Sequence, residues 1–464
     1  MALNARATQE LRSNTRGQVI TPADSGYEEA RHVWNAMIDK RPAAIVRPRG
    51  AADVITAVKF ALEHQLPLAV RGGAHNVSGK ATCDDGLVID FSSMKGIRVD
   101  PVARTVRAEP GLKWFEFDRE TQAFGLATTG GTVGDTGIAG LTLGGGFGWL
   151  GGKLGMTVDN VLAADVVLAT GELLRASASE NADLFWAIRG GGGNFGIVTS
   201  FEYQLHPIGP MIVGGMIIHP FSAARDVFRF YGDLIKKAPD ELTVAVALLT
   251  APDGNKACGL VAAYIGPLED GEKAVRPIKA FGNPVMDIIG PIPYVGQQSL
   301  LEQAMPPGFL NYHKADFVKD VSAGLIDAMV DGFSRVPSPQ SSALLFPIHG
   351  AASRVAPDAT AFPHRKGLHA GVYSLWTNPA ENVTHIGWVR QTLDQMKPFV
   401  ENVVYVNELG EDDLNTRVHE AYGVNYARLA SIKAKYDPSN VFQLNANIKP
   451  ADTARPGPVS VMGA

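Results

Sequence analysis

The chain has 464 residues, 45% of them hydrophobic and 19% charged, and its formal net charge is −5. These proportions are typical of a soluble globular protein, and the length predicts two or three domains. Because charges of both signs are mixed along the chain, we expect neither a nucleic-acid partner nor binding to a membrane surface. The chain opens without an apolar signal segment, and no run is long enough for a membrane helix. These features predict a cytoplasmic protein.

The part of the chain before residue 208 alternates short apolar strands, helical patterns and glycine-rich loops. Residues 1–30 are expected to be a polar lead-in. Strands are predicted at residues 43–50, 66–70, 86–94 and 103–111, on both sides of the turn at 170–171, and just before residue 208. Helices are predicted at residues 52–64, at 112–124 and from residue 181. This order indicates an α+β or α/β architecture.

The sequence changes in character near residue 208, where the glycine clusters end. Long amphipathic stretches such as 223–238 then alternate with apolar strands such as 241–250, which predicts a second domain. Short strands and a helix at 425–435 are expected near the end of the chain. The predicted segments are 1–207, 208–400, 401–450 and a flexible tail at 451–464.

The loop RGGAHNVSGK, at residues 71–80, directly follows a predicted strand. Gly72 and Gly73 permit a ligand to approach the backbone closely, and successive N–H groups in such a turn form a concavity that binds anions. Arg71 adds a charge that suits a diphosphate. A P-loop is disfavoured, because Ala74 stands where the first glycine is required and Ala81 replaces the Ser or Thr. The loop is therefore predicted to hold a diphosphate.

A second segment, residues 130–155, contains twelve glycines. Gly146 and Gly151 complete a formal dinucleotide fingerprint, which leaves an NAD-dependent dehydrogenase open, but the segment follows no clear strand and has too much glycine for a stable helix. We interpret it as extended, irregular backbone along a long, flat ligand. No G-x-S-x-G, H-E-x-x-H or C-x-x-C motif is present, which disfavours a serine hydrolase or a zinc site. Cys83 and Cys258 are expected to be free thiols.

Seven segments in this order resemble one flavoprotein family. They are RGGAHN at 71–76, GGTVGDTGIAGLTLGGGFGWL at 130–150, GMTVDNV at 155–161, DLFWAIRGGGGNFGIVTSF at 183–201, TAFPHR at 360–365, YVN at 405–407 and YDPSNVFQLNANIKP at 436–450. The chain resembles the berberine-bridge-enzyme-like oxidases of the vanillyl-alcohol-oxidase, or PCMH-type, FAD-binding superfamily. The resemblance implies an α+β fold. Its FAD domain is formed by the N- and C-terminal parts, and a substrate domain with an antiparallel sheet backed by helices interrupts it.

The resemblance also implies that the 8α-methyl carbon of FAD is bonded covalently to His75. In many relatives a cysteine forms a second bond, but Val133 stands at that position, so no cysteinyl link is expected. Thr136 lies where the family controls oxygen access, and its small side chain is compatible with an oxidase. The residues expected around FAD are Arg71, Gly72, Gly73, Ala74, His75, Asn76, Gly79, Gly131, Thr132, Val133, Gly134, Thr136, Gly137, Gly140, Gly144, Gly145, Gly155, Asn160, Val198, Tyr405, Asn407, Asn445 and Asn447.

The catalytic base of relatives is often the residue after Y-x-N, commonly a tyrosine, and here that residue is Glu408. A carboxyl group beside a flavin and apolar walls would have a raised pKa and could take the substrate proton. The alternative is that Glu408 is solvated or paired with a lysine. A second tyrosine position of the family is occupied by Val77. Further catalytic candidates are Tyr405, Tyr312, His349, His313 and Tyr373.

These features predict an FAD-linked oxidoreductase. It is expected to be an oxidase that acts on a C–OH or C–N group of a small, partly apolar substrate and reduces O2 to H2O2. The aromatic content of 8% does not indicate the stacking surface of a long oligosaccharide groove. A flavoprotein dehydrogenase, a secondary-metabolite tailoring enzyme and a non-catalytic flavin-binding protein remain alternatives, because one fold hosts many activities. The expected partners are the substrate and O2, and the chain is expected to be a monomer or a homodimer.

Overall fold

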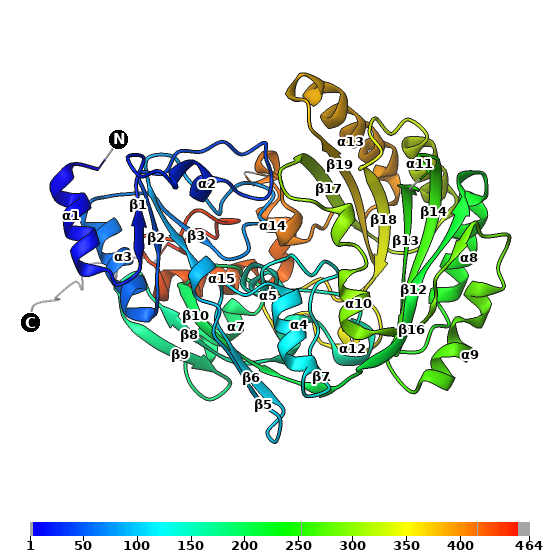
Figure 1. Ribbon diagram of the computed structural model, residues 1–464, viewed down its shortest axis with the longest axis horizontal. Helices are drawn as coiled ribbons and strands as arrows, with labels where there is room; N and C mark the ends of the chain where they lie inside the picture. The colour runs from blue at the N-terminus through cyan, green and yellow to red at the C-terminus, as the bar shows by residue number, and fades with distance from the viewer. Residues whose placement is uncertain (1–2, 252, 415, 453–464) are drawn as a thin grey trace, which may run out of the picture.

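Sheets at the two ends of an elongated molecule organise the chain (Figure 1). The computed structural model describes residues 3–251, 253–414 and 416–452. Sheets from the N-terminal half form one lobe, and a large antiparallel sheet forms the other (Figure 1). Most of the tail predicted to be flexible, residues 453–464, lies outside the described residues.

A four-stranded sheet lies near the N-terminus in the first lobe. Its strands are β1 (Gln18–Ile20), β2 (Ala44–Arg47), β4 (Leu87–Asp90) and β3 (Leu68–Arg71), in that order across the sheet, and its helices are α1 (Ala5–Asn14), α2 (Tyr27–Arg31) and α3 (Ala51–Glu63). β4 runs parallel to both β2 and β3. The expectation of a polar lead-in was wrong. Ala7 and Leu11 lie four residues apart on one face of α1, and both are buried where α1 contacts α3.

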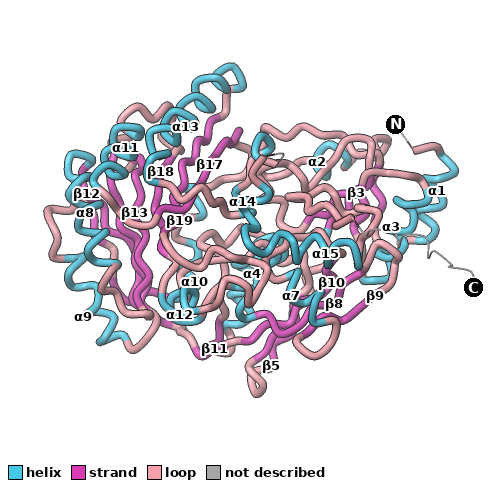
Figure 2. The backbone as a smooth tube through the Cα atoms, turned by 180° about the vertical axis from the view of Figure 1, so that it is seen from behind, coloured by secondary structure: helices cyan, strands magenta, loops and turns pink. Residues whose placement is uncertain are grey.

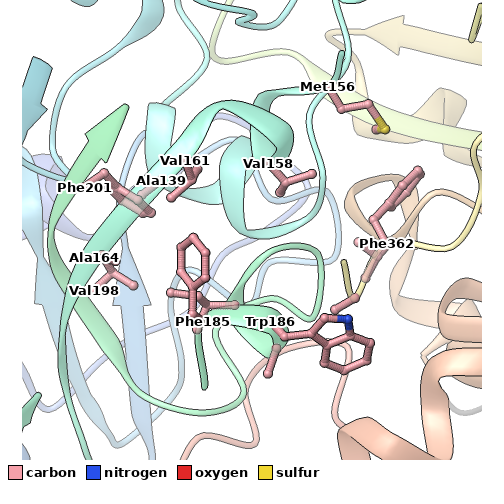
Figure 3. Close-up of a cluster of buried hydrophobic side chains, with 14 of the residues drawn as sticks. Ala139, Met156, Val158, Val161, Ala164, Phe185, Trp186, Val198, Phe201 and Phe362 are labelled. Carbon is pink, nitrogen blue, oxygen red and sulfur yellow. The ribbon is translucent and has the colours of Figure 1, made fainter. Parts of the chain in front are cut away.

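A five-stranded antiparallel sheet completes the first lobe. Its order is β5 (Ile97–Asp100), β6 (Thr105–Ala108), β10 (Ile197–Gln204), β8 (Val161–Val167) and β9 (Leu173–Ser177), and it is accompanied by α4 (Trp114–Gln122) and α7 (Ala182–Ile188). Phe185 and Trp186 of α7 are buried in one apolar cluster with Val198 and Phe201 of β10 (Figure 3). This core fixes α7 and the loop after it against the sheet.

The glycine-rich segment is less extended than expected. It contains α5 (Ile138–Leu143) and α6 (Gly151–Leu154), and the 3-10 helix η2 (Thr157–Asn160) follows it. α5 forms because it includes a single glycine and buries Ile138, Ala139 and Thr142. The prediction of irregular backbone was therefore wrong for these turns, but residues 145–148 between the helices are irregular.

The second lobe is built on one large antiparallel sheet. Its order is β15 (Met286–Asp287), β12 (Met211–Pro220), β14 (Lys256–Tyr264), β13 (Leu242–Thr250), β18 (Ser342–Pro347), β19 (Leu368–Trp376) and β17 (Leu310–Val318), and β16 (Gly290–Pro293) also pairs with β12. The helices α8 (Ala224–Ile235), α9 (Leu268–Lys279), α11 (Ala323–Phe333) and α13 (Asn382–Met396) cover its outer face (Figure 2). The predicted α+β class and the helix-backed antiparallel sheet are confirmed.

The two faces of the large sheet have different neighbours, because successive side chains of a strand point to opposite sides. Val244, Val246 and Leu248 of β13 are buried in the apolar core shared with the covering helices. Ala245 and Ala247 point the other way, toward the first lobe. The long helices thus cover one face of the sheet, and the part of the other face that α6 and α10 leave uncovered is available to form a cavity wall.

Short elements lie outside the three larger sheets, and two helix–helix contacts among them connect the lobes. β7 (Leu126–Ala127) pairs with β11 (His206–Pro207), α10 (Tyr294–Ser299) contacts α4, and α12 (Gly350–Arg354) contacts α6. None of the described helices is long and apolar enough to cross a membrane. Cys83 and Cys258 are buried and form no disulfide, as expected for free thiols.

The C-terminal segment returns to the first lobe. It contains the 3-10 helices η7 (Val406–Glu408), η8 (Glu411–Asp413) and η9 (Gly423–Asn425), and the helices α14 (Val418–Tyr422) and α15 (Tyr426–Tyr436). α15 confirms the helix predicted at 425–435. The short strands predicted here were wrong, because none occurs among the described residues from 401 to 450. Loop side chains bind this backbone instead, as where the amide of Ile448 donates to Oδ1 of Asn194.

A buried ion pair fastens this segment to the first lobe. Lys433 and Asp437 both have fully buried side chains, and the Lys433 ammonium donates to the Asp437 carboxylate at 2.6 Å. The same ammonium donates to the carbonyls of Asn194 at 2.7 Å and Phe442 at 3.3 Å. The amide of Val441 donates to the other oxygen of Asp437. Both charges therefore keep hydrogen-bond partners in place of water.

Replacing Lys433 by methionine is expected to lower the free energy of unfolding by about 3–5 kcal/mol, because Asp437 would be left as a buried, unpaired charge. Lys435→Met is the matched control. Lys435 is 59% exposed in its pair with Asp183, and its loss is expected to cost about 1 kcal/mol or less. Urea unfolding followed by tryptophan fluorescence measures both changes, and equal losses would contradict this account.

Candidate functional site

A cavity of about 450 Å³ lies between the first lobe and the open face of the large sheet. Its walls come from the loops at 72–77 and 131–140, the turn at 192–193, the sheet strands and the segment at 405–408. The volume is within the usual range for small-molecule and cofactor pockets. The cavity is therefore the candidate site, and its lining decides what it can hold.

Two glycine backbones in direct contact join the first two walls. A Cβ atom at Gly73 would lie 2.4 Å from the Cα of Gly137, and one at Gly137 would lie 2.5 Å from the Cα of Gly73. Neither position tolerates a side chain, so bare backbone forms the wall where the loops meet. Gly140 differs, because nothing lies within 4 Å of its Cβ position. Space is therefore open beside the loops at this point.

Most of the residues predicted around FAD line this cavity. They are Gly72, Gly73, Ala74, His75, Asn76, Gly131, Thr132, Val133, Thr136, Gly137, Gly140, Val198, Tyr405, Asn407 and Asn445. Gly144 and Asn160 lie outside the lining: a Cβ at Gly144 would meet the Asn407 side chain, and the Asn160 amide donates to the carbonyls of Leu154 and Met156. Gly79, Gly134, Gly145, Gly155 and Asn447 also lie outside the lining.

The charge predicted to face a diphosphate, that of Arg71, does not reach the cavity. The buried guanidinium donates to the carbonyl oxygens of Ala30, Arg31 and Ala81, at 2.5, 3.3 and 3.2 Å. It also lies 3.9 Å from the carboxylate of Asp90. These partners satisfy the group, so its role is to anchor the start of the glycine loop. The predicted charge contact is corrected accordingly.

His75 reaches the cavity in a fixed orientation. Its ring stacks on Trp34, with the centroids 4.9 Å apart and the planes at 19°. Its Nε2 atom lies 3.1 Å from Oδ2 of Asp135, and Lys113 bonds to the other oxygen of that carboxylate. The His75 side chain is 17% exposed, so a ligand in the cavity can reach it.

The open face of the large sheet forms a wall whose polarity changes from strand to strand. Its polar side chains are Ser342 of β18, His313 of β17, and His369 and Tyr373 of β19, which lie toward the β17 edge. A Cβ at Gly371 would lie 2.3 Å from the Tyr373 ring, so the glycine makes room for that ring. The rest of the wall is apolar and consists of Met216, Ala245, Ala247, Leu249, Val261, Leu344 and Phe346. A ligand with an apolar body and one polar end suits this surface.

Glu408 lies beside the polar edge of this wall. Its Oε2 atom is buried, has no hydrogen-bond partner among the described residues, and lies 3.6 Å from Nε2 of His313. Burial raises the pKa of Glu408 to about 7, and the Tyr373 hydroxyl limits the rise. Lys314, which follows His313, pairs with Asp412 and Asp413 instead. The Glu408 side chain is 18% exposed, and it pairs with no lysine in the part of the chain that is described.

His313 and His369 are neutral imidazoles that lack partners. They are 5% and 2% exposed, and burial lowers the pKa of each to about 3. None of their four ring nitrogens has a hydrogen-bond partner within the described ranges. Buried polar groups without partners are rare and costly, so these nitrogens mark positions where a ligand or water binds.

Tyr405 and Asn407 form a bonded pair in the wall. The Asn407 amide and the backbone N–H of Gly146 both donate to the Tyr405 hydroxyl oxygen, at 2.8 and 3.0 Å. Both lone pairs are thus occupied and the hydroxyl proton is left to donate. Burial raises the pKa of Tyr405, so this group acts as a hydrogen-bond donor rather than as a base. The Gly146 amide is used in this contact, which leaves the dinucleotide interpretation without support.

Two predicted catalytic candidates lie outside the cavity lining. Tyr312 precedes His313 on β17, so strand alternation turns it to the other face, where its hydroxyl donates to Asp412 at 2.8 Å. His349 lies at the start of α12, 3.1 Å from the Thr243 hydroxyl. Both predictions are corrected, since neither side chain lines the cavity.

Some lining residues belong to none of the segments singled out in the sequence, among them Trp34 and His369. The alternation of β19 could have identified His369, because it lies four residues before Tyr373 and so shares its face. Trp34 belongs to no helix or strand, so no periodic pattern in the sequence could identify it as a site residue.

Two family models match the segments that build the cofactor side of this cavity. Residues 42–177 match the model described as "FAD binding domain". Residues 404–449 match the model described as "Berberine and berberine like". The matches therefore include the loops at 72–77 and 131–140 and the segment at 405–408.

Curated relatives match nearly the whole chain. An FAD-linked oxidoreductase of Dictyostelium discoideum is 33% identical over 447 residues, which are 95% of this chain and 96% of the relative. The (R)-6-hydroxynicotine oxidase of Paenarthrobacter nicotinovorans is 29% identical, with coverage of 94% and 97%.

Solved structures share the whole architecture. The 6-hydroxy-D-nicotine oxidase from Arthrobacter nicotinovorans matches with a TM-score of 0.87 and 27% identity, over 94% of this chain and 98% of that chain. A chitooligosaccharide oxidase at 24% identity shares the fold, with a TM-score of 0.84 and coverage of 96% and 99%. The chain therefore belongs to the berberine-bridge-enzyme-like FAD-linked oxidoreductases of the PCMH-type FAD-binding superfamily.

Proposed function

We propose that the protein is an oxidase whose FAD is bonded once, to His75, and that it oxidises a C–OH or C–N group of a small, partly apolar substrate with O2 as acceptor. Three observations about the cavity support the cofactor. Bare glycine backbone lines it, space is open beside Gly140, and His75 is accessible from it. Val133 lines the same wall and has no atom that could form a second bond. Thr136, also in the lining, has a small side chain, which is compatible with access of O2.

FAD, when bound, supplies hydride acceptance and the reduction of O2. The loops at 72–77 and 131–140 would hold it together with Asn407 and Asn445, which line the same cavity. The protein must then hold the substrate, exclude water and remove one proton from the substrate O–H or N–H group. The polar edge of the sheet wall is the part of the lining that is equipped for these tasks.

The observation that carries this proposal is the buried carboxyl group of Glu408, whose pKa is about 7. A base with a pKa near the working pH is ionised often enough to act and is still basic enough to accept a proton. His313, 3.6 Å from this carboxyl group, and the hydroxyl of Tyr373 are placed to bind the same polar end of the substrate. Glu408 is therefore proposed as the base, and the two neutral groups as its orienting partners.

The charges of the lining restrict the substrate class. Lys80 is its only lysine or arginine among the described residues, and it belongs to the loop that carries His75. The polar edge offers a carboxyl group and two neutral imidazoles. An alcohol or an amine meets these groups favourably, whereas a carboxylate or a phosphate there would face Glu408 without a cation. We therefore expect a neutral or cationic substrate.

A screen of matched alcohols and amines tests the oxidase activity. Compounds with an apolar body and one hydroxyl or amino group are expected to release H2O2 in a peroxidase-coupled assay, and to bleach the flavin under anaerobic conditions. Bleaching without peroxide release in air would contradict the choice of O2 as acceptor. Activity confined to carboxylates or phosphates would contradict the proposed substrate class.

His75→Ala is expected to keep FAD binding but to release the flavin on acid precipitation, because the bond to the imidazole is lost. Wild-type precipitate should stay yellow, and mass spectrometry should find FAD on the peptide that contains His75. His349→Ala is the control, since His349 lies outside the lining and should retain the covalent flavin. An unmodified His75 peptide in wild-type protein grown with ample riboflavin would rule out the linkage.

Glu408→Gln is expected to slow flavin reduction by about 10²–10⁴-fold, the usual contribution of a positioned base. The pKa of Glu408 is raised from its ordinary value, so the carboxyl group holds its proton up to about pH 7 and is a base only above it. The wild-type rate of anaerobic flavin reduction should therefore rise as the pH passes through about 7. This step should vanish in Glu408→Gln and persist in Glu401→Gln, whose side chain is exposed. An unchanged rate and profile in Glu408→Gln would exclude Glu408 as the base.

A further inference from the structure

The surroundings of His75 include a carboxylate that no step of substrate oxidation uses. Asp135 places Oδ2 3.1 Å from Nε2 of the imidazole. On the ring face, Trp34 stacks at 4.9 Å, and the indole N–H donates to the carbonyl of Met305 at 3.1 Å. Stacking on Trp34 therefore fixes the plane of the imidazole ring, and the contact with Asp135 fixes the direction in which Nε2 points.

A carboxylate on one nitrogen decides which nitrogen of an imidazole carries the proton. Asp135 can only accept, so the proton of the neutral ring resides on Nε2 and the lone pair on Nδ1. The same arrangement is known from metal sites, where a carboxylate orients a ligating histidine and increases its basicity. His75 is thus prepared to act as a nucleophile through Nδ1.

Asp135 is itself kept in its ionised form. Burial alone would raise its pKa, but hydrogen bonds from His75 and Lys113 and the Lys113 charge hold that pKa below its ordinary value. Lys113 is fixed because its backbone forms an antiparallel bridge with Gly137. Lys113, Asp135 and His75 thus form a chain of contacts that ends at Nε2 of the imidazole, whose other nitrogen, Nδ1, is the proposed attachment atom.

The Asp135 side chain is not needed to shape its own loop. Backbone bonds hold that loop on both sides: the amide of Trp114 donates to the carbonyl of Thr136, and the amide of Phe115 to that of Gly134. Ile138 closes the loop with a bond to the Leu112 carbonyl. Because these backbone bonds hold the loop, the contact of the Asp135 carboxylate with His75 indicates a role at the imidazole.

We propose that Asp135 is the positioning residue for attachment of FAD to His75, an inference that rests on the covalent link of the proposed function. In this step the flavin 8α-methyl group loses a proton to solvent and Nδ1 of His75 forms the new N–C bond. The electron pair passes into the isoalloxazine ring, which O2 reoxidises with formation of H2O2. The imidazole becomes cationic as the bond forms, and Asp135 stabilises that charge or takes the Nε2 proton.

The test follows attachment rather than turnover. Protein made without riboflavin is mixed with FAD in air, and covalent flavin is measured over time by fluorescence after denaturing electrophoresis and by mass spectrometry. Asp135→Ala is expected to slow attachment on the order of 10–100-fold, the range found for orienting partners of histidine ligands. Because Asp135 is 31% exposed, added formate should reach the vacated position and restore part of the rate.

Two further variants separate this role from a structural one. Asp135→Asn keeps the size and an acceptor oxygen but loses the charge, so an attachment rate between those of the wild type and Asp135→Ala is expected. If Asp135→Ala fails to bind FAD, the attachment rate of Asp135→Asn tests the role of Asp135. Glu302→Gln is the control, because Glu302 lies against Gly134 of the same loop, and it should attach FAD at the wild-type rate.

The outcomes distinguish this inference from the proposed function. A wild-type protein that binds FAD without any covalent product would refute the link itself. Covalent product in the wild type, with Asp135→Ala and Asp135→Asn attaching FAD equally fast, would overturn the role of Asp135 and leave the link intact. Slow attachment that formate does not restore, in a variant that binds FAD normally, would also overturn it.

Discussion

The contact between the backbones of Gly73 and Gly137 is the constraint on which the site depends. It brings the loop that carries His75 against the loop that carries Asp135, and a single methyl group at either glycine would separate them. With the loops in contact, the imidazole and the carboxylate lie within hydrogen-bond distance and the cavity wall is bare backbone. A wall without side chains lets a flat ligand lie close to the chain.

Hydrophobic periodicity predicted the elements whose apolar pattern is strong. α3, α4, α8, β13 and α15 lie close to where the sequence places them, because each buries several apolar side chains. Periodicity failed where burial depends on few residues, as in α1, which is secured by Ala7 and Leu11. It failed again after residue 401, where side chains such as Asn194 bind the backbone and no neighbouring strand does so. Such long-range contacts leave no local pattern.

The sequence predicted the site residues that belong to motifs. It did not predict those whose place in the cavity depends on the register of a strand. His75, Asn407 and Glu408 belong to recognisable segments, and all three line the cavity. Tyr312 and His313 are neighbours in sequence, and only the register of β17 with β19 determines which of them faces the ligand. Arg71 also shows that residue type alone does not determine a contact. Its guanidinium suits a phosphate, but in the structure it donates to three carbonyl groups and does not reach the cavity.

The segment fastened by Lys433 and Asp437 has a consequence for the order of events during biosynthesis. Its residues Tyr405, Asn407 and Asn445 complete a wall that otherwise consists of loops made much earlier by the ribosome. N-terminal parts fold first during translation, so the sheets can form while the cofactor chamber still lacks one side. The wall of the FAD site is therefore complete only after the ribosome has made the chain as far as Asn445, beyond α15.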